Sequence, residues 1–229
     1  MGRSEDKAKE SCSNFAMKKA YKYYDNYDYD TAIKYCSLAI KIDRQNGMAY
    51  NLRGAMYTHN YWFTWSFRDL NKALKLGFIN ETVYTNLGVA HMLLGECNNA
   101  VNNFSNALAI NSNHFCAWSN RGYTFFKMKL YGKAIPDLKI ALTLIPNDPI
   151  PLLNLNDSYL RRGNLHLNAG RNLEAVEDFS SAMNYYDFVV EAYEGRASAY
   201  TNLGLIDLAK ADMVKAKFFR DEYELNQQD

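Results

Sequence analysis

Four histidines and four cysteines are the side chains of this 229-residue chain that could hold a metal or pair as nucleophile and base. Their spacing fits neither role. The chain has no His-Glu-x-x-His helix, no Cys-x-x-Cys pair, no glycine-rich phosphate loop after a strand, and no Ser or Cys elbow. We interpret the histidines as packing residues, at His59, His91, His114 and His166. The sequence therefore predicts a protein that is not an enzyme and needs no metal or other cofactor.

The charge, the apolar runs and the cysteines of the chain indicate which partners and which cellular compartment to expect. Lys and Arg total 26 against 25 Asp and Glu, and this formal charge of +1 gives no broad positive field for a nucleic acid or an anionic membrane. No apolar run approaches the roughly 20 residues that a membrane span needs. The cysteines form no disulfide framework, so we interpret them as free thiols in a reducing compartment. We expect a cytoplasmic protein, although a removed signal sequence would leave no trace.

Small residues recur at a fixed interval along the chain. The first series stands at Ala20, Gly54, Gly88, Gly122, Gly163 and Ala197. A second series follows twelve places later, and a third comes seven places after the second, at Ala39, Ala73, Ala107, Ala141, Ala182 and Ala216. The interval is 34 residues, except for one of 41. A constant period of this length predicts stacked supersecondary units.

Large side chains at helical spacing surround these small residues. One series stands three places after the first small residue, at Tyr23, Tyr57, His91, Phe125, His166 and Tyr200, and we expect it to face the core. Gly95, Gly170 and Gly204 follow at the predicted turns, where a residue must leave the helical region. Each unit is therefore predicted as helix, turn, helix. Because a lone helix pair cannot cover its apolar face, the hairpins should stack into an all-α solenoid.

The fourth and third units carry a family resemblance. The fourth unit has Trp118, Gly122, Phe125, Ala134, Leu138, Ala141 and Pro146, which resembles the tetratricopeptide signature Trp, Leu-Gly, Tyr, Ala, Phe, Ala, Pro, with Arg121 in place of the Leu. The third unit resembles it through Tyr84, Leu87, Gly88, His91, Ala100, Phe104 and Ala107. The resemblance implies a right-handed α-α superhelix in which the first helices line a concave groove. It implies a role in holding a protein or peptide.

We expect one domain over residues 1–229 that contains six such repeats. The repeats are placed at about 13–46, 47–80, 81–114, 115–148, 156–189 and 190–223, with an insertion at 149–155. Asp148 and Pro149 make a good helix start, so the inserted residues could lengthen the next helix; alternatively Leu152, Leu153 and Leu155 form a contact surface. A C-terminal capping segment is expected to close the last hairpin through Phe218, Phe219 and Tyr223.

The expected groove is mostly neutral and rich in amides. Its candidate partner-binding residues are Tyr21, Met48, Asn51, Asn86, Asn120, Tyr123 and Asn164. Amide side chains both donate and accept, so they could bind the main chain of an extended or helical segment while the tyrosines and Met48 supply apolar contacts. The alternative is that these asparagines are solvated and bind nothing. We expect a protein or peptide partner, held by a scaffold or adaptor.

Relatives that bind the acidic C-terminal tails of chaperones use a two-carboxylate clamp of Lys, Asn, Asn, Lys and Arg over three consecutive units. No window of this chain carries that set. The window over the third to fifth units keeps Asn120 and Arg161, but it places Asp157 where a Lys should meet the ligand carboxylate. That acid would repel the tail. We therefore expect the groove not to bind an acidic chaperone tail.

The turn of the second unit has an unusual aromatic cluster. Trp62 and Trp65 occupy places where other units put residues such as Asp28, Glu96 or Asn99, which suit water. An exposed aromatic cluster is typical of a partner or oligomer surface. The alternatives are contact with a partner, self-assembly of a structural subunit through this hairpin tip, or local packing onto the tip of the first unit.

Overall fold

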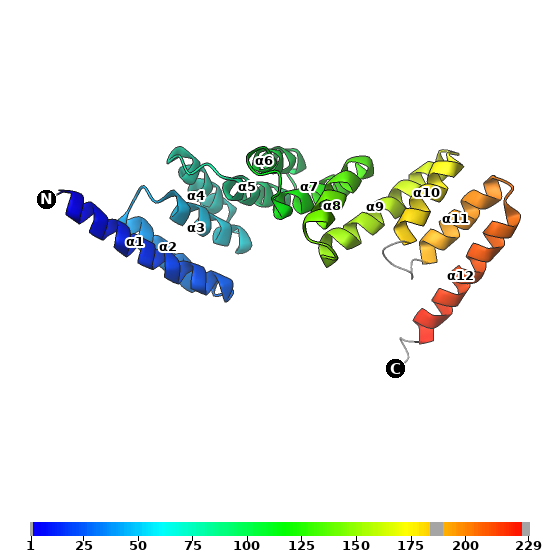
Figure 1. The fold of residues 1–229 in the computed structure, drawn as a ribbon, viewed down its shortest axis with the longest axis horizontal. Helices are drawn as coiled ribbons and strands as arrows, with labels where there is room; N and C mark the ends of the chain where they lie inside the picture. The colour runs from blue at the N-terminus through cyan, green and yellow to red at the C-terminus, as the bar shows by residue number, and fades with distance from the viewer. Residues whose placement is uncertain (1, 184–189, 226–229) are drawn as a thin grey trace. The chain divides into compact units, whose positions relative to one another are not determined.

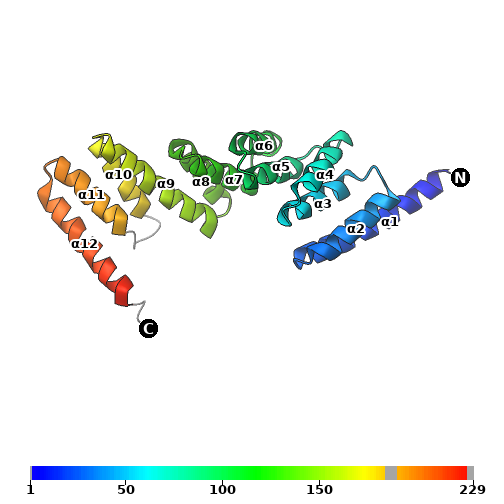
Figure 2. The ribbon, with the colours of Figure 1, turned by 180° about the vertical axis from the view of Figure 1, so that it is seen from behind.

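A computed structural model of the protein describes residues 2–183 and 190–225, with side chains for 10–183 and 190–221. Within the described residues the chain forms twelve α-helices and no strand, so the predicted all-α class is confirmed. Consecutive helices pair as antiparallel hairpins, which Figures 1 and 2 show from opposite sides. The chain divides into two compact units, Met1–Ala117 and Trp118–Asp229. We describe each unit by itself, and the single domain over 1–229 stays a prediction.

The first unit contains three hairpins. Its helices are α1 (Gly2–Asp25), α2 (Tyr29–Ile42), α3 (Gly47–His59), α4 (Phe63–Lys75), α5 (Glu81–Leu93) and α6 (Cys97–Ile110). Several of these helices begin at a capping side chain. The carboxylate of Asp28 accepts the Thr31 amide at 3.1 Å, and the side-chain oxygen of Asn46 accepts the Ala49 amide at 2.9 Å. Such caps satisfy amides that have no partner inside the helix.

The second unit contains the remaining hairpins. Its helices are α7 (Phe115–Lys127), whose first residues precede the division, α8 (Tyr131–Leu144), α9 (Pro149–Asn168), α10 (Asn172–Met183), α11 (Val190–Asn202) and α12 (Ile206–Leu225). The inserted residues belong to α9, which is 20 residues long and is capped by Asp148. Leu155 is fully buried in this helix whereas Leu153 is exposed, so the three inserted leucines do not form one contact surface.

In every hairpin, the turn after the first helix contains a residue with a left-handed backbone conformation. The six equivalent positions all have φ between 60° and 78°, at Tyr27, Tyr61, Gly95, Lys129, Gly170 and Gly204. The three glycines were predicted as turn residues, and they adopt this conformation without steric cost. A residue with a Cβ pays roughly 1–2 kcal/mol there. Tyr27, Tyr61 and Lys129 therefore sit at strained turns.

The core of four of the hairpins depends on a glycine that faces a large side chain sixteen residues later. A Cβ on Gly88 would lie 2.5 Å from Phe104, and one on Gly54 would lie 2.8 Å from Leu70, both far inside van der Waals contact. The same offset joins Gly122 to Leu138 and Gly163 to Phe179. The four large side chains of these pairs are fully buried. Close backbone approach is thus what lets each large side chain fill its hairpin.

Other predicted core positions are only partly buried. The series from Tyr23 to Tyr200 is half-buried throughout, because these rings pack at the rims of the hairpins. Tyr23, for example, stacks on Tyr35 with ring centres 5.4 Å apart. None of the four cysteines forms a disulfide. Burial raises the pKa of Cys36 to about 12, so this thiol stays protonated and unreactive at neutral pH.

The predicted cap of the last hairpin is only partly correct. Phe219 stacks on Tyr193, with ring centres 5.6 Å apart. Phe218 is 55% exposed instead of buried, and its ring lies 5.4 Å from that of Phe219. The side chain of Tyr223 lies outside the described residues.

We expect Phe104→Ala to destabilise the protein by about 3–5 kcal/mol, because it empties the space against Gly88. Phe15→Ala is the matched control in the same unit, since the Phe15 ring is 63% exposed, and it should cost less than about 1 kcal/mol. Urea unfolding followed by circular dichroism measures both. Equal losses for the two variants would contradict this account of the core.

Candidate functional site

Two of the predicted groove amides contact each other in the first unit. The side-chain nitrogen of Asn86, on α5, donates to the Asn51 side-chain oxygen on α3 at 2.9 Å. Asn51 in turn donates to the Thr82 hydroxyl at 3.1 Å, and Thr82 donates to Asn80, the cap of α5, at 2.9 Å. We call Asn51, Asn80, Thr82 and Asn86 the amide cluster. It joins two first helices that are neighbours in the stack.

Within the amide cluster, Asn51 and Asn86 differ in their access to solvent. Asn51 is buried, so it holds Asn86 in place more than it faces a partner. Asn86 is half-buried and uses one of its two N–H groups in the bond to Asn51. An amide carries two donors and one acceptor oxygen, so Asn86 can still offer a donor and an acceptor to a ligand main chain.

Tyr21 and Met48 also reach the surface of the first unit. Both are about two-fifths exposed, at 39% and 41%. Tyr21 lines a shallow hollow on α1 together with Phe15, Lys18 and Lys22. Partial burial raises the pKa of Tyr21, so its hydroxyl remains a hydrogen-bond donor at neutral pH. No described hydrogen bond joins these two residues to the amide cluster, so their role as partner contacts stays a prediction.

The other predicted groove residues belong to the second unit. Asn120 and Tyr123 are half-buried on α7, and the Tyr123 ring lies 6.4 Å from that of Phe126. Asn164 is exposed on α9. On the same helix, Arg161 and Asp157 form an exposed ion pair at 3.0 Å. The hydrogen bond to Asp157 and the negative charge of that carboxylate raise the pKa of Arg161.

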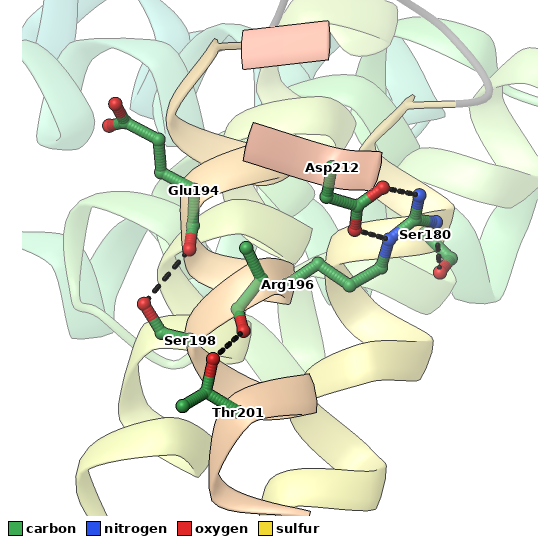
Figure 3. Close-up of polar contacts among 7 residues, drawn as sticks. Ser180, Glu194, Arg196, Ser198, Thr201 and Asp212 are labelled. Atoms are coloured by element: carbon green, nitrogen blue, oxygen red, sulfur yellow. Dashed lines mark hydrogen bonds and ion pairs between the residues drawn. The ribbon is translucent and has the colours of Figure 1, made fainter. Parts of the chain in front are cut away.

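A half-buried arginine joins two consecutive hairpins, a feature that we did not predict from the sequence. In Figure 3 the Arg196 guanidinium on α11 meets Asp212 of α12 with two bonds, at 2.7 and 2.8 Å, and Ser180 of α10 with a third at 2.8 Å. Arg53 on α3 repeats this arrangement: it bonds Asp69 of α4 at 2.6 and 3.1 Å and Ser37 of α2 at 2.9 Å. We call these two arrangements arginine brackets.

Arginine pairs with aspartate in two further hairpins at the same separation. Arg121 bonds Asp137 at 2.6 and 3.0 Å, and Arg162 bonds Asp178 at 2.8 and 2.7 Å. In all four hairpins the two residues are sixteen apart. The sequence carries a pattern that could have predicted these pairs: an Arg lies directly before the first small residue of the unit, and an Asp lies sixteen places after that Arg. In the sequence, Arg121 stood out only as a departure from the tetratricopeptide signature.

Burial and charge compete at these pairs. Burial disfavours the charged guanidinium of Arg53, but the hydrogen bonds and charge of Asp69 outweigh it and raise the Arg53 pKa. At Arg162 and Arg196 the hydrogen bonds to Asp178 and Asp212 are the main cause of a raised pKa. The aspartates are nearly inaccessible to solvent. Removing one partner would leave the other charge buried and unpaired, which is strongly destabilising.

The aromatic tip of the second hairpin is exposed. Trp62 and Trp65 are 50% and 53% accessible, and Tyr61, at the strained turn, is 68% accessible. Trp62 contacts Tyr57 of its own hairpin, with ring centres 5.8 Å apart. The tip therefore offers about half of each indole to solvent.

The described residues contain no cluster of three His, Cys, Asp or Glu side chains placed to hold a metal ion. His91 instead packs against Phe67 and bonds Glu96 at 2.7 Å, while His166 accepts from Arg171 at 2.8 Å. None of the helices in the described part of the chain is long and apolar enough to cross a membrane.

Two curated proteins match about half of the chain. No family model matches the chain. It is 26% identical to Tetratricopeptide repeat protein 6 of Homo sapiens over 126 residues, which are 55% of this chain and 24% of that protein. It is 30% identical to Heat shock protein STI1 of Saccharomyces cerevisiae over 129 residues, or 56% of this chain and 21% of that protein. The match thus spans about a quarter or less of each relative.

Solved structures extend the likeness over most of the chain. A tetratricopeptide repeat protein from Parabacteroides merdae matches with a TM-score of 0.57 and 20% identity, covering 95% of this chain and 88% of that one. The chain has the helical repeat fold of tetratricopeptide-repeat proteins. YrrB, described as a TPR protein with an unusual peptide-binding site, matches with a TM-score of 0.58 and 17% identity over 77% of this chain and 88% of its own. Tetratricopeptide-repeat proteins are generally non-catalytic scaffolds that bind proteins or peptides.

The buried pairs predict a large coupling energy. In a double-mutant cycle, Arg53→Ala and Asp69→Ala should each cost about 3–5 kcal/mol, while the double variant should cost much less than their sum. Thermal and urea unfolding measure the free energies. The matched control is the Arg161 and Asp157 pair, whose side chains are 55% and 32% exposed and whose coupling should stay below about 1 kcal/mol. Equal coupling in both cycles would refute a structural role for the buried pair.

Proposed function

We propose that this tetratricopeptide-repeat protein is a non-catalytic scaffold or adaptor whose first helices bind a peptide or protein segment. The observation that carries the proposal is the bond between Asn86 and Asn51, which orients an accessible amide before any ligand arrives. An oriented amide loses less side-chain entropy on binding than a free one. Tyr21 and Met48 would add contacts in the first unit, and the first helices of the second unit offer their own set in Asn120, Tyr123 and Asn164.

The charges on α9 argue against an acidic tail as the ligand of these first helices. Arg161, the cation that a carboxylate clamp would need, is engaged by Asp157 at 3.0 Å. An incoming carboxylate would have to displace Asp157 while it is repelled by that same acid. A neutral main chain meets no such opposition at Asn86 or Asn120. We therefore favour a ligand that is recognised through its backbone amides and carbonyls.

The test is affinity capture from native lysate with mass spectrometry, followed by titration of the captured segment as a labelled peptide. Asn86→Ala with Asn120→Ala should weaken binding roughly tenfold, because each lost hydrogen bond contributes about 0.5–1.5 kcal/mol. The matched control is Asn102→Ala with Asn106→Ala, two exposed amides on α6. An affinity unchanged by the first pair, or reduced equally by the second, would reject binding on the first helices.

A second candidate function is self-assembly through the aromatic tip, as in a structural subunit. The exposed indoles of Trp62 and Trp65 favour it, as does the strained and exposed Tyr61 beside them. Strain of this kind is often kept where a surface has a function. Glycine occupies the equivalent turn position in three other hairpins, where it carries no such strain, whereas Tyr27 and Lys129 share the strained conformation in the remaining two.

Sedimentation analysis at rising protein concentration separates this candidate from the first. If the tip is an oligomer contact, Trp62→Ala with Trp65→Ala should shift the population toward monomer by about tenfold or more in dissociation constant. Leu173→Ala is the control, since it removes another exposed apolar side chain. A wild-type protein that stays monomeric at high concentration would end this hypothesis.

A further inference from the structure

The solvent face of α4 combines three cations with a tryptophan. Trp65, Arg68, Lys72 and Lys75 are spaced three, four and three residues apart, which places them on one side of the helix. All four are exposed, and the Arg68 guanidinium carbon lies 5.5 Å from the centre of the Trp65 ring. We call these four residues the α4 stripe. At 1.5 Å of rise per residue the stripe is about 15 Å long.

The positive charge of the stripe faces solvent. Among the described side chains, no ion pair engages Arg68, Lys72 or Lys75. Asp69 is the one carboxylate in the described lining of the hollow beside the stripe, and Arg53 already holds both of its oxygens. Lys72 and Lys75 suit the C-terminal end of a helix dipole, but that effect does not explain Arg68 or the indole.

Two hollows meet at Trp65. The first is polar and runs beside the cations of the stripe, with walls that include Tyr50, Tyr57, Trp65, Arg68, Lys72 and Lys75. The second is more apolar and lies at the hairpin tip, between Tyr61, Trp62, Phe63, Trp65 and Leu94. The surface thus changes from apolar to basic along one line, with the exposed indole at the junction.

The same face of the other second helices lacks this combination. The equivalent positions on α6 hold Asn99, Asn102, Asn106 and Ala109. On α2 they hold Thr31, Lys34, Leu38 and Lys41. The α4 stripe is therefore a property of this hairpin and not of the repeat.

We propose that the α4 stripe and the adjoining aromatic hollow bind a short acidic protein segment that carries an apolar anchor. The anchor is a leucine or aromatic side chain that enters the hollow beside Trp62 and Leu94. Two or three carboxylates follow it and meet Arg68, Lys72 and Lys75. About five extended residues cover the 15 Å of the stripe at roughly 3.3 Å each. This surface is separate from the amide cluster, so the proposal does not depend on binding by the first helices.

Charge and size favour a peptide over a nucleic acid. Three cations can neutralise only about three phosphates, which supports weak and strongly salt-dependent binding. The formal charge of the whole chain is +1, so no wider basic field extends the stripe. An acidic segment with one buried side chain gains both apolar burial at Trp65 and charge pairing along α4.

Fluorescence anisotropy with a dye-labelled synthetic peptide tests the proposal. The probe has one leucine followed by alternating glutamate and aspartate. One comparison peptide replaces the leucine with serine, and a second replaces the acids with glutamine and asparagine. We expect the probe to bind most tightly, each comparison peptide to bind at least about fivefold more weakly, and the affinity to fall as salt rises.

Variants of the full chain locate the binding surface. Arg68→Glu with Lys72→Glu and Lys75→Glu should weaken probe binding by about tenfold or more, and Trp65→Ala by about fivefold. The matched control is Lys210→Glu with Lys215→Glu and Lys217→Glu, exposed positions on α12 that change the formal charge equally. That control, and Asn86→Ala, should stay within about twofold of the wild-type affinity. Circular dichroism confirms that each variant is folded.

Several results would overturn the proposal. One is that the wild-type chain does not bind the probe. Another is that the α12 control loses as much probe affinity as the α4 variant. A third is that the uncharged peptide binds as tightly as the probe. Tighter binding of a short oligouridine that displaces the probe would assign the stripe to nucleic acid instead. Loss of probe binding in Asn86→Ala alone would place the probe on the first helices.

Discussion

The close approach of the two helices in each hairpin sets the geometry of the rest of this protein. Gly54 and Gly88 leave no room for a Cβ, and Leu70 and Phe104 occupy the space, each sixteen residues later. The residue before the glycine is then directed toward the residue before the large side chain. This is why Arg53 meets Asp69 with the same separation of sixteen. One spacing therefore determines both the apolar contact and the ion pair beside it.

The arginine brackets add specificity to packing that would be stable without them. A buried ion pair contributes little net stability over a well-packed apolar pair, because both charges lose their water. It does penalise every arrangement that separates the charges. Since Arg53 and Arg196 also bond Ser37 and Ser180 of the preceding hairpin, the penalty applies to the register between hairpins as well as within them. Small residues alone would tolerate sliding, whereas a forked guanidinium does not.

Local periodicity made much of this fold predictable from sequence. The helices, the glycine turns and the long α9 follow from spacings along short stretches of the chain, and the recurrence of the same residues every 34 places gives the repeat. Features that depend on contacts between hairpins could not be predicted from these spacings. Asn51 looked like a surface amide, yet the neighbouring first helix buries it through Asn86 and Thr82. Phe218 looked like a cap, but it is exposed, and Phe219 is the ring that stacks on Tyr193 of α11. The exposure of Trp62 and Trp65 was left open, because the pattern of polar and apolar residues along the chain cannot show which neighbouring hairpin covers a side chain.

The length of α9 has a consequence for how this chain can change in evolution. Seven residues are two helical turns to within about 20°, so adding them displaces the helix start without rotating its faces. Pro151, Leu155 and Tyr159 accordingly share the buried side along the whole helix. An insertion of five residues would rotate the upstream segment by about half a turn and expose Leu155. Viable length variants of this protein should therefore come in discrete steps, with sizes that the helical pitch selects.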